Sequence, residues 1–123
     1  RLRDLYISGG ENVYPAEVES ALRDVAGLVD AAVIGIPDAR WGEVGLAVVV
    51  TGSEVHLDAA RIKLALRARL AGFQIPPEIR FVDALPRTAT GKVRKSELRS
   101  RYCDVGGPTG ADPDELTQRR GSY

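Results

Sequence analysis

The sequence contains one cysteine, one histidine and no methionine among its 123 residues. The single cysteine, Cys103, excludes an internal disulfide framework and fits a reducing compartment, so we expect a cytoplasmic protein. His56 and Cys103 form neither a metal-ligand spacing nor a recognisable nucleophile–base pair, so we expect no metal site in this chain. We interpret His56 as a surface loop residue.

An excess of charge of one sign and long apolar runs are also lacking. Lysine and arginine total 17, as do aspartate and glutamate, so the formal net charge is zero. No overall field therefore favours nucleic acid or an anionic membrane, and any basic function must be local. No apolar run approaches the roughly 18 residues of a membrane-spanning helix, and we expect neither a transmembrane segment nor a signal peptide.

The lack of methionine extends to position 1, where the chain opens directly on the letters RLRDLYISGG. We expect a segment of a longer polypeptide, although processing of a natural N-terminus would leave the same pattern. The length is enough for one domain with a modest core. The content of 44% hydrophobic and 28% charged residues is ordinary for a globular domain.

Short apolar patterns alternate between the periods of strands and helices. The expected strands are residues 5–8, 29–37, 45–52 and 78–83, and the expected helices are residues 14–27, 57–70 and 95–103. This order, β-α-β-β-α-β-α, predicts an α+β fold: a small open β-sheet with helices packed on it. We divide the chain into a domain at residues 1–102 and a mobile tail at residues 103–123, which is rich in glycine, proline and aspartate.

The segment PRTATGKVRK, residues 86–95, concentrates four basic side chains in ten residues. It is not a P-loop, because Pro86 stands where that motif needs its first glycine and Val93 follows the lysine. The Lys92 ammonium is a compact charge on a four-carbon stem that can reach an oxyanion or a phosphate. Gly91 allows the backbone to approach a ligand closely. From composition alone, a simply solvated basic loop stays open as the alternative.

Two long motifs resemble the C-terminal domain of acyl-CoA synthetases in the adenylate-forming (ANL) superfamily. They are RLRDLYISGGENVYPAEVESAL at residues 1–22 and LPRTATGKVRKSELR at residues 85–99. The resemblance covers residues 1 to about 102 and is nearer to fatty-acyl and aryl-acyl CoA ligases than to peptide-synthetase domains. It implies a two-step reaction in the full enzyme, with acyl-AMP formed from ATP and then converted to acyl-CoA. It also implies a small lid domain that turns on a hinge between the steps.

The resemblance further implies partners that lie outside this chain. ATP, CoA and a carboxylic acid would be the substrates, and Mg²⁺ would be bound with ATP by a large N-terminal domain of the same polypeptide. The acyl pocket would lie in that domain too, so the identity of the acid stays open. We therefore expect the isolated domain to lack ligase activity.

Residue by residue, Lys92 matches the adenylation lysine, which bridges the substrate carboxylate and the α-phosphate. A cation at that position stabilises the charge that gathers in the transition state. Arg1 matches the arginine that closes on the ribose hydroxyls. Arg3 falls at the hinge, where the family usually has aspartate or lysine, and Asp4 is the alternative pivot.

Three further positions, Ser8, Gly9 and Gly10, match the loop that lines the pantetheine tunnel during thioester formation, where glycine leaves room for a thin ligand. A plain strand-to-helix turn is the alternative for them. Trp41 and Phe73 match aromatic residues that flank the CoA adenine in some aryl-CoA ligases. The alternatives are that Trp41 packs against the sheet edge and that Phe73 belongs to the core.

Basic residues often follow the second aromatic position in the family, and this chain has Gln74 and Ile75 there. This departure leaves open whether the segment grips the CoA phosphates strongly, and Arg40 or Arg80 is the candidate substitute. Lys95 is expected to be solvated and to tolerate alanine.

Two other classes of function stay open beside the ligase domain. One is a non-catalytic module that uses the basic loop on a phosphorylated partner or RNA, and the other is an interaction domain without a ligand. Tyrosine and phenylalanine total six and are scattered, so no basic and aromatic face is evident.

Overall fold

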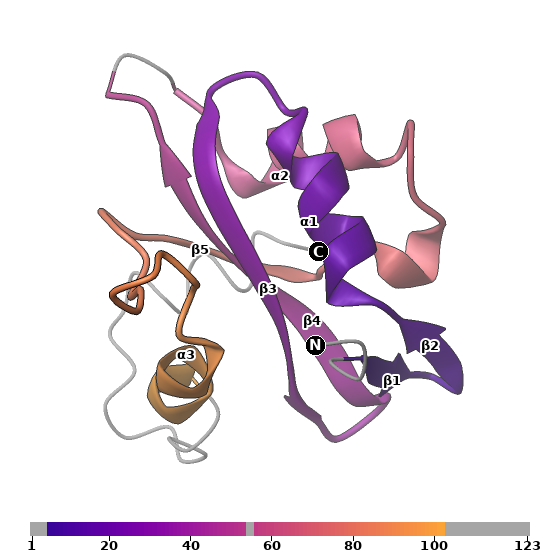
Figure 1. Cartoon of the computed structure of the whole chain (residues 1–123). Coiled ribbons are helices and arrows are strands. Elements are labelled where there is room, and N and C mark those ends of the chain that lie inside the picture. Colours follow the sequence, from indigo (N-terminus) through magenta and orange to yellow (C-terminus); the bar gives the residue numbers. More distant parts are fainter. Residues whose placement is uncertain (1–4, 54–55, 103–123) are drawn as a thin grey trace.

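The computed structural model describes residues 5–53 and 56–102, which form a sheet with helices on both of its faces (Figure 1). The elements in chain order are β1 (Tyr6–Ser8), β2 (Glu11–Val13), α1 (Pro15–Arg23), β3 (Leu28–Asp38), β4 (Gly42–Thr51), α2 (Ala59–Leu66), the 3-10 helix η1 (Gly72–Gln74), β5 (Glu78–Phe81) and α3 (Lys95–Tyr102). The predicted nucleotide and hinge residues Arg1, Arg3 and Asp4 lie outside the described residues, as does the predicted tail at residues 103–123.

The sheet is built on the long hairpin of β3 and β4, which pair antiparallel over their whole length. β5 runs parallel to β4 opposite residues 46–49. β1 meets the beginning of β4 at one register pair, Ser8 with Gly42, and its other edge pairs with β2. The predicted α+β class and small open sheet are therefore confirmed.

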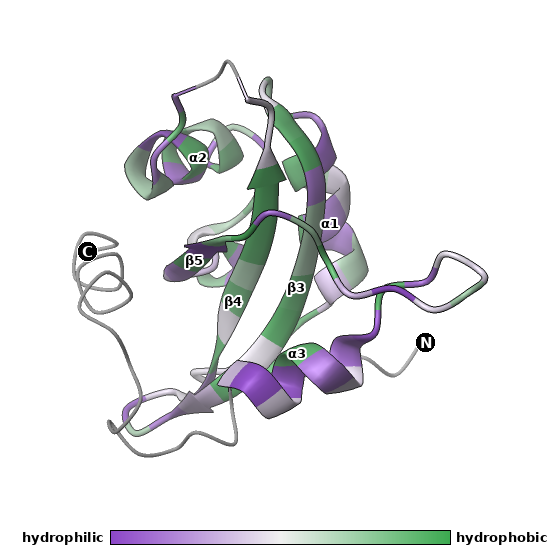
Figure 2. Cartoon of the chain, turned by 90° about the vertical axis from the view of Figure 1, so that its left-hand side faces the viewer, coloured by the Kyte–Doolittle hydropathy of each residue, from purple (hydrophilic) through white to green (hydrophobic). Residues whose placement is uncertain are grey.

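Apolar side chains cover both faces of the sheet, because successive residues of a strand point to opposite sides. Val33 of β3 belongs to the core beneath α1 and α2, whereas its neighbour Ile34 belongs to the core beneath α3. Figure 2 shows hydrophobic residues along most of β3 and β4, as expected of strands that are buried on both sides. Within residues 5–53 and 56–102, no helix is both long enough and apolar enough to cross a bilayer.

Helix α1 begins at Pro15, one residue after the predicted start, because proline costs no hydrogen bond in the first turn. Val18 and Leu22 are fully buried against the sheet, and Arg23 in the last turn suits the negative end of the helix dipole. The helix ends earlier than expected, since Asp24 is its C-cap. The chain then turns through Val25 before β3.

Strand β2 was not predicted. Only Val13 of its three residues is buried, so the segment lacks the alternating apolar pattern that indicates a strand. The strand forms because a tight turn folds it back on β1 as a hairpin. Gly9 and Gly10 have φ values of +58° and +88°, the left-handed conformations that such turns require.

Helix α2 is shorter than the predicted helix at residues 57–70. It begins after Asp58, whose side chain accepts a hydrogen bond from the Arg61 N–H at 2.8 Å. Beyond Leu66 the chain continues in turns, where Arg69 donates its N–H to the Leu66 carbonyl. Leu70 still packs on the core. The apolar pattern thus predicted the helix but neither its start nor its end.

A slot in the sheet receives the Tyr6 ring. Gly35 and Gly45 are register partners in β3 and β4. A Cβ added to Gly35 would come within 2.5 Å of the Tyr6 Cβ, and one added to Gly45 would collide with the Tyr6 hydroxyl. Tyr6 is only 3% exposed. Its burial raises the pKa of the phenol above the ordinary range, and the Glu43 carboxylate raises it further.

Candidate functional sites

Lys92 lies in a small hairpin of residues 86–94, between β5 and α3. Arg87 and Val93 form an antiparallel bridge, and the Thr88 N–H donates to the Lys92 carbonyl at 2.8 Å. The turn is closed by the Gly91 N–H, which donates to the Thr88 carbonyl at 2.9 Å. Gly91 has φ +94°, a conformation that favours glycine. The predicted basic loop therefore has a defined backbone.

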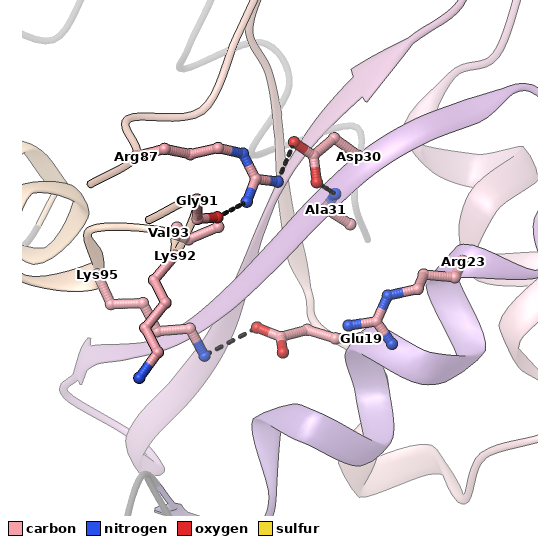
Figure 3. Close-up of a pocket in the computed structure, with 9 residues that line it drawn as sticks. All are labelled: Glu19, Arg23, Asp30, Ala31, Arg87, Gly91, Lys92, Val93 and Lys95. Atoms are coloured by element: carbon pink, nitrogen blue, oxygen red, sulfur yellow. Dashed lines mark hydrogen bonds and ion pairs between the residues drawn. The ribbon is translucent and has the colours of Figure 1, made fainter. Parts of the chain in front are cut away.

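This hairpin, α1, β3 and the first residue of α3 border an open cleft of about 470 Å³ (Figure 3). Its charged lining residues are four cations and two carboxylates: Arg23, Arg87, Lys92 and Lys95, with Glu19 and Asp30. The cleft therefore carries an excess of positive charge, although the whole chain is neutral. The composition of the loop left a simply solvated surface and an anion-binding one open, and an excess of positive charge is what the second requires.

Lys95 is paired inside the cleft. Its Nζ lies 2.8 Å from Glu19 Oε2, and the same oxygen accepts a hydrogen bond from the Val33 N–H at 2.9 Å. The Lys95 and Glu19 side chains are only 21% and 13% exposed. The prediction that Lys95 is a solvated charge is therefore wrong: this side chain connects α3 to α1 and to β3.

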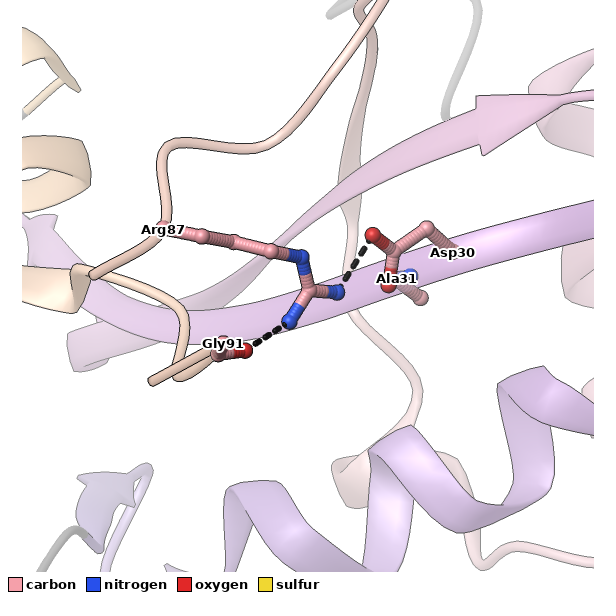
Figure 4. A network of polar contacts seen from close by, with 4 residues as sticks. All are labelled: Asp30, Ala31, Arg87 and Gly91. Carbon is pink, nitrogen blue, oxygen red and sulfur yellow. Dashed lines mark hydrogen bonds and ion pairs between the residues drawn. The ribbon is translucent and has the colours of Figure 1, made fainter. Parts of the chain in front are cut away.

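Arg87 is paired on the other side of the hairpin, with two groups at once (Figure 4). Its guanidinium donates to the Gly91 carbonyl at 2.5 Å and to Asp30 Oδ2 at 2.5 Å. The second carboxylate oxygen of Asp30 accepts the Ala31 N–H at 3.0 Å. The hairpin is thereby fastened to β3.

Lys92 differs from both of these cations. It is exposed, and among the described residues its ammonium has no hydrogen bond or ion pair. Figure 3 shows the side chain extending away from Arg87, in the direction of the Lys95–Glu19 pair. An unpaired ammonium on an ordered hairpin is suited to receive an anion from outside the domain.

A second candidate surface lies at the β1–β2 turn. The Gly9 N–H donates to the Trp41 carbonyl at 2.9 Å, and a Cβ added to Gly9 would come within 2.9 Å of the Trp41 ring. Ser8 pairs with the residue after Trp41, and Gly10 completes the turn. Four of the predicted CoA-binding residues thus adjoin one another, and Trp41 remains 47% exposed.

Arg40 also contacts this surface. Its guanidinium carbon lies 4.7 Å from the centroid of the Trp41 ring, which is cation–π geometry. Asp38 Oδ2 fixes the turn by accepting the backbone N–H groups of Arg40 and Trp41, at 3.0 and 2.9 Å. Arg40, one of the two cations considered for the CoA phosphates, therefore lies beside Trp41 at the β1–β2 turn.

Arg80, the other cation considered, is engaged elsewhere. Its side chain is 12% exposed, lies 3.5 Å from Glu78 Oε1 and stands over the Tyr102 ring at 5.9 Å. Lys63 of α2 joins this region by donating to the Pro77 carbonyl at 2.7 Å. Burial lowers the pKa of Lys63 to about 8, against the opposing effect of the Glu78 carboxylate. We interpret these charges as structural.

Phe73 lies in η1, where it is 43% exposed and outside both core clusters. The alternative that it is a core residue is therefore wrong. η1 packs beside β2, and Gln74 Nε2 donates to Glu17 Oε1 of α1 at 3.0 Å. The helix that carries Phe73 thus adjoins the β1–β2 hairpin at β2, whereas Trp41 packs on Gly9 in its turn.

The two candidate surfaces are separated along β3. Asp30 anchors the Lys92 hairpin, and Asp38 anchors the Trp41 turn. Eight positions of extended strand separate these aspartates, roughly 25 Å. Asp30 could not be identified from the sequence, because Arg87 is 57 residues away and no local pattern joins them, whereas the contacts of Asp38 are local. The described part of the chain holds no group of three or more His, Cys, Asp or Glu side chains suited to a metal ion.

A protein-family model and several known proteins are similar to this chain. A family model described as "AMP-binding enzyme C-terminal domain" matches residues 17–92. Feruloyl-CoA synthase of an Amycolatopsis species is 51% identical over 102 residues, which are 83% of this chain and 21% of the relative. The 3-[(3aS,4S,7aS)-7a-methyl-1,5-dioxo-octahydro-1H-inden-4-yl]propanoyl:CoA ligase of Mycobacterium tuberculosis is 56% identical over 99 residues, 80% of this chain and 20% of the relative.

Solved structures also match the chain. The ATP-bound MatB of Rhodopseudomonas palustris superposes with a TM-score of 0.80 at 45% identity, over 85% of this chain and 21% of that one. A Mycobacterium tuberculosis fatty acyl CoA synthetase gives a TM-score of 0.78 at 45% identity, with the same coverage. The chain thus spans about a fifth of the length of the proteins it matches.

Proposed function

Because the chain belongs to the AMP-binding enzyme C-terminal domain family, we propose that it is the lid domain of an AMP-forming acyl-CoA ligase. A large N-terminal domain of the same polypeptide would hold ATP with its Mg²⁺, and the carboxylic acid. The observation that carries the proposal is the Lys92 ammonium, which stands on an ordered hairpin and has no ion pair with any residue that the structure describes. The curated relatives named above are CoA ligases or synthases that act on different acids, so the acid is not specified.

In the first step the substrate carboxylate attacks the α-phosphorus of ATP, and pyrophosphate leaves as acyl-AMP forms. Two anions approach each other, and negative charge gathers on the phosphoryl oxygens in the transition state. The Lys92 ammonium neutralises that charge when this face of the domain covers the active site. Arg1 binds the ribose hydroxyls in the same arrangement.

In the second step the CoA sulfur attacks the acyl carbonyl of acyl-AMP, the thioester forms and AMP leaves. Here the turn of Ser8, Gly9 and Gly10 lines the passage for pantetheine. Trp41 and Phe73 border the CoA adenine: both are exposed aromatic residues, Trp41 packs on Gly9 of that turn, and the 3-10 helix of Phe73 contacts β2, the strand after the turn. The Arg40 guanidinium serves the CoA phosphates.

The separation of the two surfaces supports a reaction in two arrangements of the domains. Surfaces roughly 25 Å apart on one rigid sheet do not reach one active site in a single pose. The domain must therefore turn between the steps, and we assign the pivot to Arg3 or Asp4. Such motions complete one catalytic arrangement at a time.

The test measures the two steps separately for Lys92→Ala in the enzyme that carries both domains. ATP–pyrophosphate exchange that depends on the acid should fall by about 10²–10³-fold. Formation of acyl-CoA from supplied acyl-AMP and CoA should stay within a few-fold of wild type. Arg94→Ala is the matched control, because it removes an exposed cation two residues away whose ion pair, among the described residues, is with Glu97 of α3.

An exchange rate at the wild-type level in Lys92→Ala would show that another residue is the adenylation lysine. A wild-type enzyme without acid-dependent exchange would favour the non-catalytic phosphate- or RNA-binding module instead.

A further inference from the structure

Arg87 holds the Lys92 hairpin through three separate interactions. Its backbone forms the bridge with Val93 that closes the hairpin. Its guanidinium donates to the carbonyl of Gly91, the residue directly before Lys92. The same guanidinium donates to Asp30 on β3 (Figure 4). The peptide group that carries Lys92 is thus linked by one side chain to the central hairpin of the sheet.

Asp30 is itself held in place. Its Oδ1 accepts the N–H of Ala31 while its Oδ2 receives Arg87, so both carboxylate oxygens are engaged. The two side chains of the pair are 40% and 29% exposed. An ion pair with this exposure adds little to the free energy of folding. A guanidinium that donates to two acceptors at fixed positions, however, holds the hairpin in a defined position relative to β3.

We propose that Arg87 and Asp30 are positioning residues for Lys92, an inference that rests on the proposed function. Lys92 has a long side chain and, among the described residues, no ion pair of its own, so its reach depends on where its backbone is held. A displacement of about 1 Å at a reacting group can cost on the order of 10²-fold in rate. Asp30 acts through Arg87, and Arg87 acts through Gly91.

The kinetic test uses Arg87→Ala, Asp30→Ala and their combination in the enzyme that carries both domains. The kcat of acid-dependent ATP–pyrophosphate exchange should fall about 10–100-fold in Arg87→Ala, with little change in the KM for ATP. Acyl-CoA formation from supplied acyl-AMP should stay within a few-fold of wild type. Because Asp30 acts through Arg87, the double variant should be no slower than Arg87→Ala.

Two further variants distinguish the positioning of the hairpin by Arg87 from the effect of the charge that Arg87 carries. Arg87→Lys keeps the charge but lacks the fork that reaches both acceptors, so its exchange rate should lie between those of Arg87→Ala and wild type. Arg94→Ala removes the same charge from an exposed side chain that pairs with Glu97, and it should exchange at nearly the wild-type rate.

A second readout does not depend on activity. Amide hydrogen exchange in the peptide that covers residues 86–94 should be at least tenfold faster in Arg87→Ala, whereas α1 should be unchanged. An Arg87→Ala enzyme that exchanges pyrophosphate like wild type while Lys92→Ala does not would overturn this inference alone. Equal losses in both half-reactions, together with a lower melting temperature, would overturn it too. A lack of exchange in the wild-type enzyme would overturn the proposed function.

Discussion

Lys92 and Lys95 are three positions apart and have the same side chain, yet their surroundings give them different roles. Lys95 is 21% exposed and shares Glu19 Oε2 with a backbone N–H of β3. Lys92 is exposed and, in the part of the chain that the structure describes, has no ion pair. The environment of each ammonium, rather than its residue type, separates a structural group from a candidate for catalysis.

Substitution of Lys95 by alanine should therefore destabilise the fold. The Glu19 carboxylate would lose its charged partner in a half-buried position, at a cost of about 1–2 kcal/mol in the free energy of unfolding. Urea denaturation of the chain measures this. Arg94→Ala, whose ion pair with Glu97 is exposed, should cost well under 1 kcal/mol. Unfolding free energies that are equal for Lys95→Ala and wild type would mean that the pair contributes nothing to stability.

Tyr6 should make the fold sensitive to high pH. Its pKa is raised in the folded state, chiefly by burial, so the unfolded chain loses the phenol proton first as the pH rises above about 10. This contribution to stability is complete below pH 10 and declines above it. Tyr6→Phe keeps the ring but has no proton to lose, so its unfolding free energy should decline less between pH 8 and pH 11.

Urea titrations at these two pH values measure the difference. Tyr14→Phe is the control, because Tyr14 is 44% exposed. A decline that is the same in Tyr6→Phe and wild type would assign the alkaline effect to other groups.

Among the elements, the β1–β2 hairpin depends most on backbone conformation. Its turn uses two consecutive glycines with positive φ, and Trp41 packs directly on the first of them. Since β1 meets β4 at a single register pair, the Trp41 contact and the Tyr6 slot provide much of its attachment. This element is also the one that we assign to thioester formation.

Gly9→Ala should damage this element selectively. Alanine at φ +58° costs about 1–2 kcal/mol, and its Cβ would come within 2.9 Å of the Trp41 ring. We expect a lower melting temperature and a larger loss in acyl-CoA formation from acyl-AMP than in pyrophosphate exchange. Gly72→Ala is the matched control, because a Cβ there would meet nothing within 4 Å. A Gly9→Ala enzyme with both half-reactions intact would remove the turn from the CoA site.

The elements that the sequence predicted well are those whose own residues decide their structure. β3, β4 and α1 carry apolar periods, and Pro15 marks the start of the helix. β2 has no such period, because its neighbours and its turn form it. The same limit applies to the sites: Lys92 was predicted from its motif, whereas Arg87 and Asp30 meet across 57 residues of sequence. Only the fold brings such pairs together.

The molecule as a whole has a core on each face of its sheet, which favours independent folding. We expect the chain alone to melt cooperatively, because α1, α2 and α3 cover both faces without help from another domain. It should show no ATP–pyrophosphate exchange, since ATP and the acid would be bound by the large domain. Calorimetry and an exchange assay test the two halves of this prediction. Exchange above background in the purified chain would contradict the proposed division of labour.

The slot that holds Tyr6 also has a mechanical consequence. Tyr6 lies near the beginning of the chain, but its ring rests against Gly35 and Gly45, which are register partners within the two longest strands. A force or torque that acts on the chain at Leu5 is therefore transmitted to β3 and β4 by the next residue, Tyr6. Closely packed interiors transmit strain with little compression, so the load would rotate the whole sheet before it bent the first strand.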